Sequence, residues 1–172
     1  MSIDTLPSGE PQKGTEIERK FVITALPAEL DLSAFPYTKI DQGYLVNSHE
    51  GAVRVRRKGD RYFWTFKAAT SGHAAERVEL ETEISEEQFT TMWPGTAGRR
   101  IEKTRFEIPY GDSTIELDVF EGDNSGHVIA EVEFPSTQTA DGFMPPYWFG
   151  SDVTADKRFG NASIAERGFP EL

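Results

Sequence analysis

The sequence predicts a mainly β fold (α+β): an eight-stranded antiparallel β-barrel tunnel with a charged lumen and a few covering helices. Three observations predict it. Apolar and charged residues alternate along eight segments, short turns with Gly and Asp separate several of them, and the charged residues of each segment share one face. Because side chains two residues apart lie on the same side of a strand, this alternation indicates β-structure.

The alternation defines eight candidate strands, at residues 15–23, 37–46, 51–58, 61–68, 76–85, 99–109, 113–120 and 127–134. Gly59-Asp60 and Gly111-Asp112 supply tight turns, and residues 122–126 supply a longer one. Strands joined by such short loops pair antiparallel, since parallel pairing needs a long crossover. Eight antiparallel strands in one small domain are typical of a barrel or a sandwich.

Three helices are expected beside the strands. Residues 27–35 are predicted to form a short helix. Ser85 and Gln88 form a capping box at the start of a second helix, which Pro94 ends. A third helix is expected over residues 154–167.

The composition indicates a single domain, residues 14–172, behind a flexible leader, residues 1–13, that has no periodicity. The chain has no cysteine, and its three histidines lack ligand-like spacing, which argues against disulfides and an ordinary zinc site. No apolar run approaches the length of a membrane span and no secretory leader is visible, so we expect a cytoplasmic protein without a membrane partner. A net charge of -11 argues against nucleic acid as a partner.

The charged face of the strands carries both signs, sorted by strand. The third and fourth strands are purely basic on this face, and the seventh and eighth are purely acidic. In chain order the face carries Glu16, Glu18, Lys20, Arg54, Arg56, Lys67, Glu79, Glu81, Lys103, Arg105, Glu116, Asp118, Glu131 and Glu133.

Two interpretations of this face are open. In the first, the sheet is half solvated, with charges outward and apolar residues inward. In the second, the charges line the lumen of a wide barrel and helices cover the apolar exterior. The second is favoured because the face is nearly all charge and because an ordinary surface mixes signs more freely. Such a lumen suits a small phosphate chain, since Lys and Arg bind phosphate oxygens and carboxylates hold Mg²⁺ or Mn²⁺. An outward apolar face also leaves room for a homodimer.

Residues 16–20, Glu-Ile-Glu-Arg-Lys, form an E-x-E-x-K motif near the start of the chain. Further motifs follow in order: QGYL at 42–45, VRVR at 53–56, TFK at 65–67, ELE at 79–81, EKTR at 102–105, ELD at 116–118, EVE at 131–133 and VTADKRFGN at 153–161. With these motifs, spread over residues 14–167, the chain resembles the CYTH superfamily, the triphosphate tunnel metalloenzymes. It is most similar to the short bacterial members that act as inorganic triphosphatases.

The resemblance implies an eight-stranded tunnel, a cytoplasmic setting and metal-assisted attack on a triphosphate with Mg²⁺ or Mn²⁺. It implies a phosphate clamp of Lys20, Arg54, Arg56, Lys67, Lys103 and Arg105. It implies metal-side carboxylates at Glu16, Glu18, Glu116, Asp118, Glu131 and Glu133. Lys20, Lys103, Glu79 and Glu81 are the candidate catalytic residues. Each carboxylate has an alternative role as the salt-bridge partner of a tunnel cation.

The function expected from the resemblance is metal-dependent hydrolysis of inorganic tripolyphosphate to pyrophosphate and phosphate. One alternative is an enzyme acting on a nucleotide or thiamine triphosphate, including an adenylate cyclase. Another is a polyphosphate-binding module without turnover. The short loops favour the simple inorganic substrate, because they leave little room for a pocket that holds an organic group.

Overall fold

The computed structural model describes residues 12–69 and 77–172. These residues form a nine-stranded antiparallel sheet in the order β1-β6-β5-β4-β3-β7-β8-β9-β2. The strands are β1 (Gln12–Glu16), β2 (Glu18–Ile23), β3 (Tyr37–Asn47), β4 (Gly51–Lys58), β5 (Arg61–Ala69), β6 (Arg77–Ile84), β7 (Arg100–Tyr110), β8 (Ser113–Phe120) and β9 (Val128–Glu133). The predicted strands are therefore present, with ends that move by a few residues.

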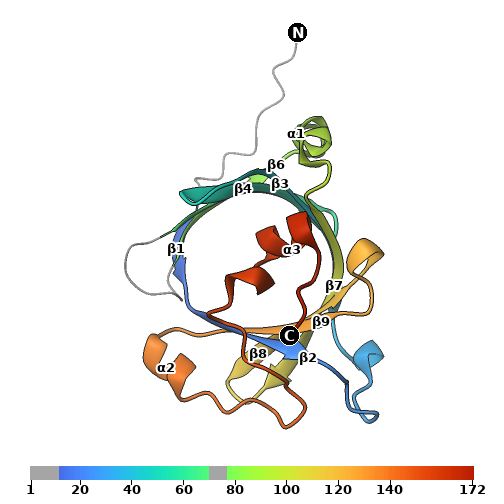
Figure 1. Ribbon diagram of the computed structural model, residues 1–172, viewed down its shortest axis with the longest axis vertical. Helices are drawn as coiled ribbons and strands as arrows, with labels where there is room; N and C mark the ends of the chain where they lie inside the picture. Colours follow the sequence, from blue (N-terminus) through green and yellow to red (C-terminus); the bar gives the residue numbers. More distant parts are fainter. Residues whose placement is uncertain (1–11, 70–76) are drawn as a thin grey trace.

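The strands run around a ring (Figure 1). The first predicted strand, residues 15–23, is two strands in the structure, because the chain changes partners at Ile17. β1 pairs with β6 at one edge of the sheet, and β2 pairs with β9 at the other. The carbonyl of Ile17 instead accepts a bond from the amide of Phe134, at 2.8 Å. The two edges are thus covalently joined at a seam in the ladder, and β1 begins at Gln12, inside the predicted leader.

The helix predicted after residue 85 is confirmed as α1 (Glu86–Met92), with the capping box of Ser85 and Gln88 in place. Its Phe89 packs on Tyr62 on the outside of the ring, with ring centroids 5.1 Å apart. A 3-10 helix, Trp93–Thr96, follows it, with a proline in its first turn. A further short helix, α2 (Thr137–Asp141), was not expected from the sequence.

Two helix predictions are wrong in extent. Within residues 27–35 only Leu32–Ala34 are helical, as one 3-10 turn, because the Asp31 side chain accepts from the amide of Ser33 and caps a single turn. Residues 154–167 are not one helix either. A 3-10 turn, Lys157–Phe159, and α3 (Asn161–Arg167) are separated by Gly160, which is extended (φ -67°, ψ 139°).

Two apolar clusters lie on opposite sides of the same strands. The outer cluster is built on Phe21, Leu117 and Val132, and the segments around Leu30 and Phe143 pack over it. Irregular chain and α2, more than the expected helices, cover this face. The other cluster lies inside the ring, where α3 is seen (Figure 1). The predicted third helix therefore fills the ring instead of covering its exterior.

In the part of the chain that the structure describes, every helix is too short or too polar to cross a membrane.

Candidate functional site

The inner face of the ring is layered along the strands. Its deepest layer is apolar: Val22, Ile101, Phe120 and Ile129 from four neighbouring strands meet Val153, Phe159 and Ile164 of the C-terminal segment. Two residues further along the same strands, the inner face becomes charged, with Lys20, Lys103, Asp118 and Glu131 buried. Another two residues along lie Glu18, Arg105, Glu116 and Glu133. The predicted charged lumen is confirmed, and an apolar floor closes one end of it.

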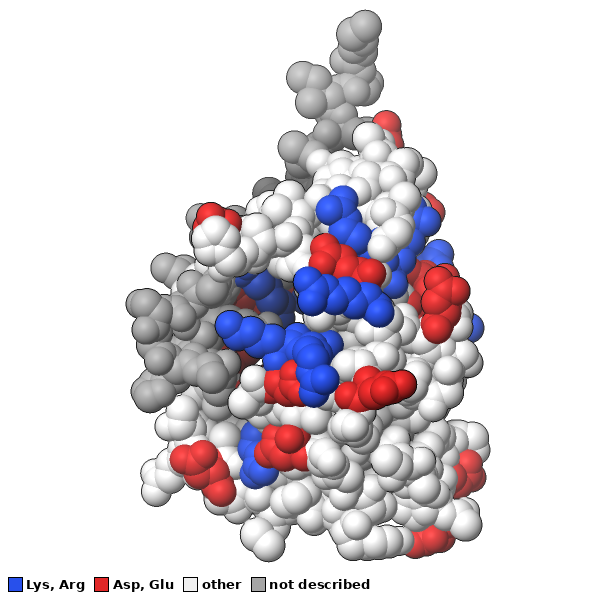
Figure 2. Space-filling model, in the orientation of Figure 1, with Lys and Arg blue, Asp and Glu red and all other residues white. Residues whose placement is uncertain are grey.

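Seen down the ring with all atoms drawn, most of the interior is filled, and Lys, Arg, Asp and Glu side chains border the hollow that remains (Figure 2). The charged layers are therefore reached through a narrow space. Charges in such a space interact more strongly than they do in bulk water.

One group of buried ion pairs links β7, β8, β9 and β2. Asp118, which has no exposed surface, binds the ammonium of Lys103 with one oxygen and Arg105 Nε with the other, the latter at 2.7 Å. Arg105 Nη2 also donates to Glu131 at 2.7 Å, and Lys20 Nζ lies 2.9 Å from the other oxygen of Glu131. Burial opposes ionisation of Glu131, but Lys20 and Arg105 hold its pKa well below the usual range. In this group each cation is paired with a carboxylate of the group, so we call it the compensated group.

A second group lies across the lumen on β4, β5, β6 and β1. Lys67 Nζ lies 2.7 Å from Glu79 and 2.9 Å from Glu16. Arg56 Nη2 donates to Glu81 at 3.0 Å, and Thr65, fully buried, donates its hydroxyl proton to the same carboxylate at 2.7 Å. These contacts follow from the register, since Thr65 is paired with Glu81 and Lys67 with Glu79.

Two arginines on β4, Arg54 and Arg56, each have a hydrogen-bond donor that is not used within the described part of the protein. Nε of Arg54 and Nε of Arg56 are buried and have no hydrogen-bond partner among the described residues. The nearest carboxylate oxygens to Arg54 Nη2 are 3.7 Å away, on Glu79 and Glu81. Burial and the adjacent charge of Arg54 lower the pKa of Arg56 to about 10. Buried donors without partners are costly, so this pair of cations is suited to bind an added anion.

Carboxylates crowd the outer layer of the lumen. Partial burial, together with the charges of Glu116, Glu16 and Glu18, raises the pKa of Glu133 to about 7. Burial and the charge of Glu131 raise the pKa of Glu18, and burial raises that of Glu116. Oxygen donors that repel one another in this way fit a hard divalent cation, which would relieve the repulsion. Among the described residues, no three acidic or imidazole side chains already converge as a metal cage, so binding requires the carboxylates to turn toward the ion.

Every predicted site residue faces this lumen, although the residues differ in how they are engaged. Asp118 and Glu131 already have all of their charge paired, which favours the salt-bridge role that the sequence left open for them. Thr65 and Gln42 are inward-facing, fully buried residues that were given no role from the sequence. Gln42 donates to the hydroxyl of the buried Tyr44 at 3.0 Å. The alternation places Thr65 on the same strand face as Lys67, and this was the available signal. An uncharged residue on a charged face does not by itself indicate a function.

Comparisons with known proteins agree with this geometry. The model of the CYTH domain family matches residues 14–141. An inorganic triphosphatase of Nitrosomonas europaea is 43% identical over 153 residues, which cover 88% of this chain and 97% of the relative. An inorganic triphosphatase of Acetivibrio thermocellus is 31% identical over 157 residues, covering 91% and 96%. A crystal structure of an inorganic triphosphatase superposes with a TM-score of 0.65 at 39% identity, covering 88% of this chain and 94% of that one. A charged lumen built from these motifs, together with a family match over most of its length, makes this chain a member of the CYTH domain family.

Proposed function

We propose that this protein hydrolyses inorganic tripolyphosphate to pyrophosphate and phosphate inside the lumen, with Mg²⁺ or Mn²⁺ as the metal. One observation carries the proposal: the same lumen holds buried Nε donors of Arg54 and Arg56 without partners among the described residues and a carboxylate, Glu133, whose pKa burial and neighbouring carboxylates raise to about 7. A phosphate chain satisfies the donors, and a divalent cation satisfies the carboxylates. The names of the two relatives, both inorganic triphosphatases, support the same substrate.

The side chains divide into three sets by what they can offer. Arg54 and Arg56 bind the phosphate chain with their unpartnered Nε donors, and Lys67, which is held by Glu79 and Glu16, adds positive charge beside them. Lys20, Lys103 and Arg105 complete the clamp from the opposite wall, where they also hold Glu131 and Asp118. The carboxylates with raised pKa values, Glu18, Glu116 and Glu133, together with Glu16, hold the metal.

Hydrolysis requires water to attack the terminal phosphorus while the bond to the pyrophosphate oxygen breaks. The bound metal would lower the charge on the phosphate oxygens that repel the attacking water. Glu79, held by Lys67, and Glu81, held by Arg56 and Thr65, would accept a hydrogen bond from that water and orient it. The clamp cations stabilise the negative charge that develops on the leaving pyrophosphate.

The experiment that tests the proposal compares substrates and products. Purified protein is incubated with tripolyphosphate, ATP or thiamine triphosphate, with Mg²⁺, with Mn²⁺ or with EDTA, and products are followed by ³¹P NMR. We expect one phosphate and one pyrophosphate per tripolyphosphate, no turnover in EDTA and much slower turnover of the organic triphosphates. Cyclic AMP from ATP would replace the proposal with the cyclase alternative. Tight binding of tripolyphosphate without product would replace it with a binding module.

A cytoplasmic setting and a homodimer remain predictions of the sequence. Fractionation of the source cells tests the first, and sedimentation of the purified protein tests the second.

A further inference from the structure

The seam of the ring raises a structural problem at β2. One edge of β2 pairs with β9, but none of the described strands pairs with the other edge, because β1 turns to β6. An open edge leaves backbone groups without partners. In this structure residues 150–154 lie along that edge: the amide of Val22 donates to Ser151 at 3.0 Å, and that of Gly150 donates to Val22 at 3.0 Å. The approach is so close that a Cβ on Gly150 would lie 2.4 Å from the carbonyl oxygen of Val22.

The same segment holds both backbone groups of Lys20. The amide of Val153 donates to the carbonyl of Lys20 at 2.8 Å, and the amide of Lys20 donates to the hydroxyl of Thr154 at 3.0 Å. Beyond it the chain enters the ring, where the carbonyl of Phe159 lies 3.5 Å from Lys20 Nζ. The backbone position of a lumen lysine is therefore set by the C-terminal segment as well as by β9.

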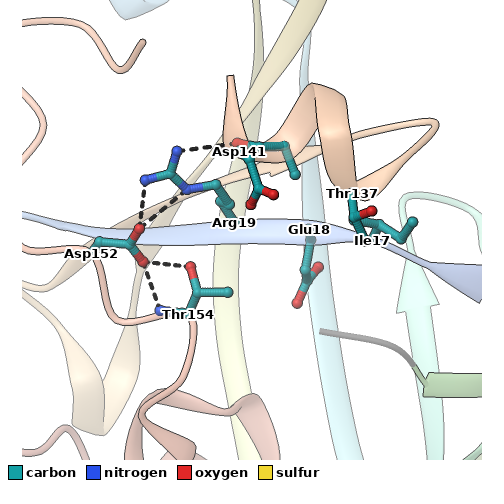
Figure 3. Close-up of a pocket in the computed structure, with 8 residues that line it drawn as sticks. Ile17, Glu18, Arg19, Thr137, Asp141, Asp152 and Thr154 are labelled. Atoms are coloured by element: carbon teal, nitrogen blue, oxygen red, sulfur yellow. Dashed lines mark hydrogen bonds and ion pairs between the residues drawn. The ribbon is translucent and has the colours of Figure 1, made fainter. Parts of the chain in front are cut away.

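Arg19, the neighbour of Lys20, points the other way, to the outside of the ring. It donates to one oxygen of Asp152 from Nε at 3.1 Å and from Nη2 at 2.6 Å. The other oxygen of Asp152 accepts from the amide of Thr154 at 2.9 Å and from its hydroxyl. Because the Thr154 hydroxyl donates its proton to Asp152, the lone pairs of the hydroxyl oxygen are free to accept from the amide of Lys20. Figure 3 shows the hydrogen bonds from Arg19 to Asp152 and from Thr154 to Asp152, with Glu18 on the side of β2 opposite Arg19.

Arg19 also binds the outer cover of the ring. Its Nη1 donates to the carbonyls of Ala140 and Phe143, each at 3.2 Å. The guanidinium lies 5.0 Å from the ring centroid of Phe21, within the range of a cation–π contact. One side chain therefore joins α2, β2 and the C-terminal segment at the wall of a cavity of about 350 Å³.

We propose that Arg19 is a positioning residue: it fastens residues 150–154 across the seam through Asp152, and through Thr154 it fixes Lys20 in the lumen. The role for Lys20 in hydrolysis rests on the proposed function, but the fastening does not. Segment 150–156 has only an isolated bridge, between Phe21 and Asp152, as regular structure. Arg19, with two donors on one oxygen of Asp152, adds a charge-assisted tether to the backbone bonds of this segment and so holds it in one register.

The chain supplies a matched control. Like Arg19, Arg57 is an outward-facing arginine beside lumen cations: it lies between Arg56 and Lys58. It pairs with Asp41, which also faces outward. That pair spans two regularly paired strands, β3 and β4. Arg57→Gln thus removes an equivalent outer ion pair from two strands that their backbone hydrogen bonds already hold in register.

The first test uses hydrogen–deuterium exchange with mass spectrometry on the full chain. We expect Arg19→Gln to raise exchange in residues 150–160 and at the start of β2 at least tenfold, with the other strands and the melting temperature close to wild type. Arg57→Gln is expected to leave those segments as in the wild type. Unchanged exchange of residues 150–160 in Arg19→Gln would overturn the fastening, whatever the substrate is. A uniform rise over the whole sheet would show a general structural role and would also overturn it.

The second test follows the link to Lys20. Thr154→Val keeps the shape and the Arg19–Asp152 pair but removes the acceptor for the amide of Lys20. We expect faster exchange of that amide, and a fall in kcat for tripolyphosphate on the order of tenfold in both Thr154→Val and Arg19→Gln. Arg19→Lys should restore part of the loss, because it keeps the charge. If Arg19→Gln raises hydrogen exchange in residues 150–160 but leaves kcat unchanged, the positioning role is overturned. A wild-type protein inert to tripolyphosphate would end the proposed function, while the exchange of the Lys20 amide would still decide the link.

Discussion

Two parts of the lumen contain the same residue types but differ in how completely their charges and donors are paired. On β7, β8 and β9 each cation meets a carboxylate at hydrogen-bonding distance, and the pKa of Glu131 falls. On β4, and in the outer layer around Glu133, donors are left over and carboxylates repel. The difference teaches that charge in a lumen is not itself a binding site. We therefore expect the compensated group to act as scaffold, and a ligand to gain free energy by binding where donors lack partners and carboxylates repel one another.

The largest expected effect is on stability, at the compensated group. Asp118→Asn leaves Lys103 and Arg105 buried without their shared carboxylate, so we expect the free energy of unfolding to fall by about 3–5 kcal/mol. Urea denaturation followed by tryptophan fluorescence measures it. Glu133→Gln is the control and should be neutral or stabilising at pH 8. If Asp118→Asn is no less stable than Glu133→Gln, the distinction between the two groups is wrong.

The next effect is on activity, at the arginines with unused donors. Arg54→Ala removes a residue of the proposed phosphate clamp, and we expect kcat/KM for tripolyphosphate to fall by about 10²–10³, the usual loss for one preorganised donor. The free energy of unfolding should change little, since the change also removes an unsatisfied buried group. Arg57→Ala, on the outside of the same strand, is the matched control. Equal kcat/KM values for the two variants would show that the lumen face of β4 does not contact the substrate.

The sequence could predict the lumen because the period-two pattern assigns every charge to one face. Arg54, Lys67 and Glu131 fall inside the ring as that pattern requires, and the pairing of β4 with β5 follows from the tight turn at Gly59-Asp60. The location of the helices was harder to predict. Residues 154–167 have a helical composition, yet Gly160 is extended and the segment enters the ring because Phe159 and Ile164 complete an apolar floor.

The division of labour within the site could not be predicted in the same way. Whether Asp118 binds a metal or Lys103 depends on cross-strand distances and burial that no local pattern contains. The seam was hidden for a related reason. Nothing in the pattern of residues 15–23 marks a break at Ile17; the change of partner there follows from closing a ring, which is a property of the whole sheet. The sequence pattern assigned no role to Arg19.

A smaller effect, on pH dependence, separates the outer carboxylates from the buried ones. The folded protein keeps a proton on Glu133 up to about pH 7, whereas an unfolded chain releases it near 4.5. The folded state binds more protons between these values, so this group makes stability fall as pH rises through that window in metal-free protein. Mg²⁺ should reverse the fall, because it replaces the proton. Melting temperatures of the wild type and of Glu133→Gln, measured from pH 4.5 to 8 with Mg²⁺ or EDTA, test this effect. If the two proteins show the same change of melting temperature with pH in EDTA, the raised pKa is not that of Glu133.

The smallest effect is expected outside the lumen, and it sets the scale for the others. Arg57 and Asp41 form an ion pair on the exterior of the ring, with 48% and 25% of their side chains exposed. Solvent screens such a pair, so Arg57→Gln should change the free energy of unfolding by less than about 1 kcal/mol. The same urea titration decides it, repeated at low and high salt, since a screened pair contributes even less at high salt. A loss as large as that of Asp118→Asn would mean that burial does not govern the strength of these pairs, and the contrast between lumen and surface would fail with it.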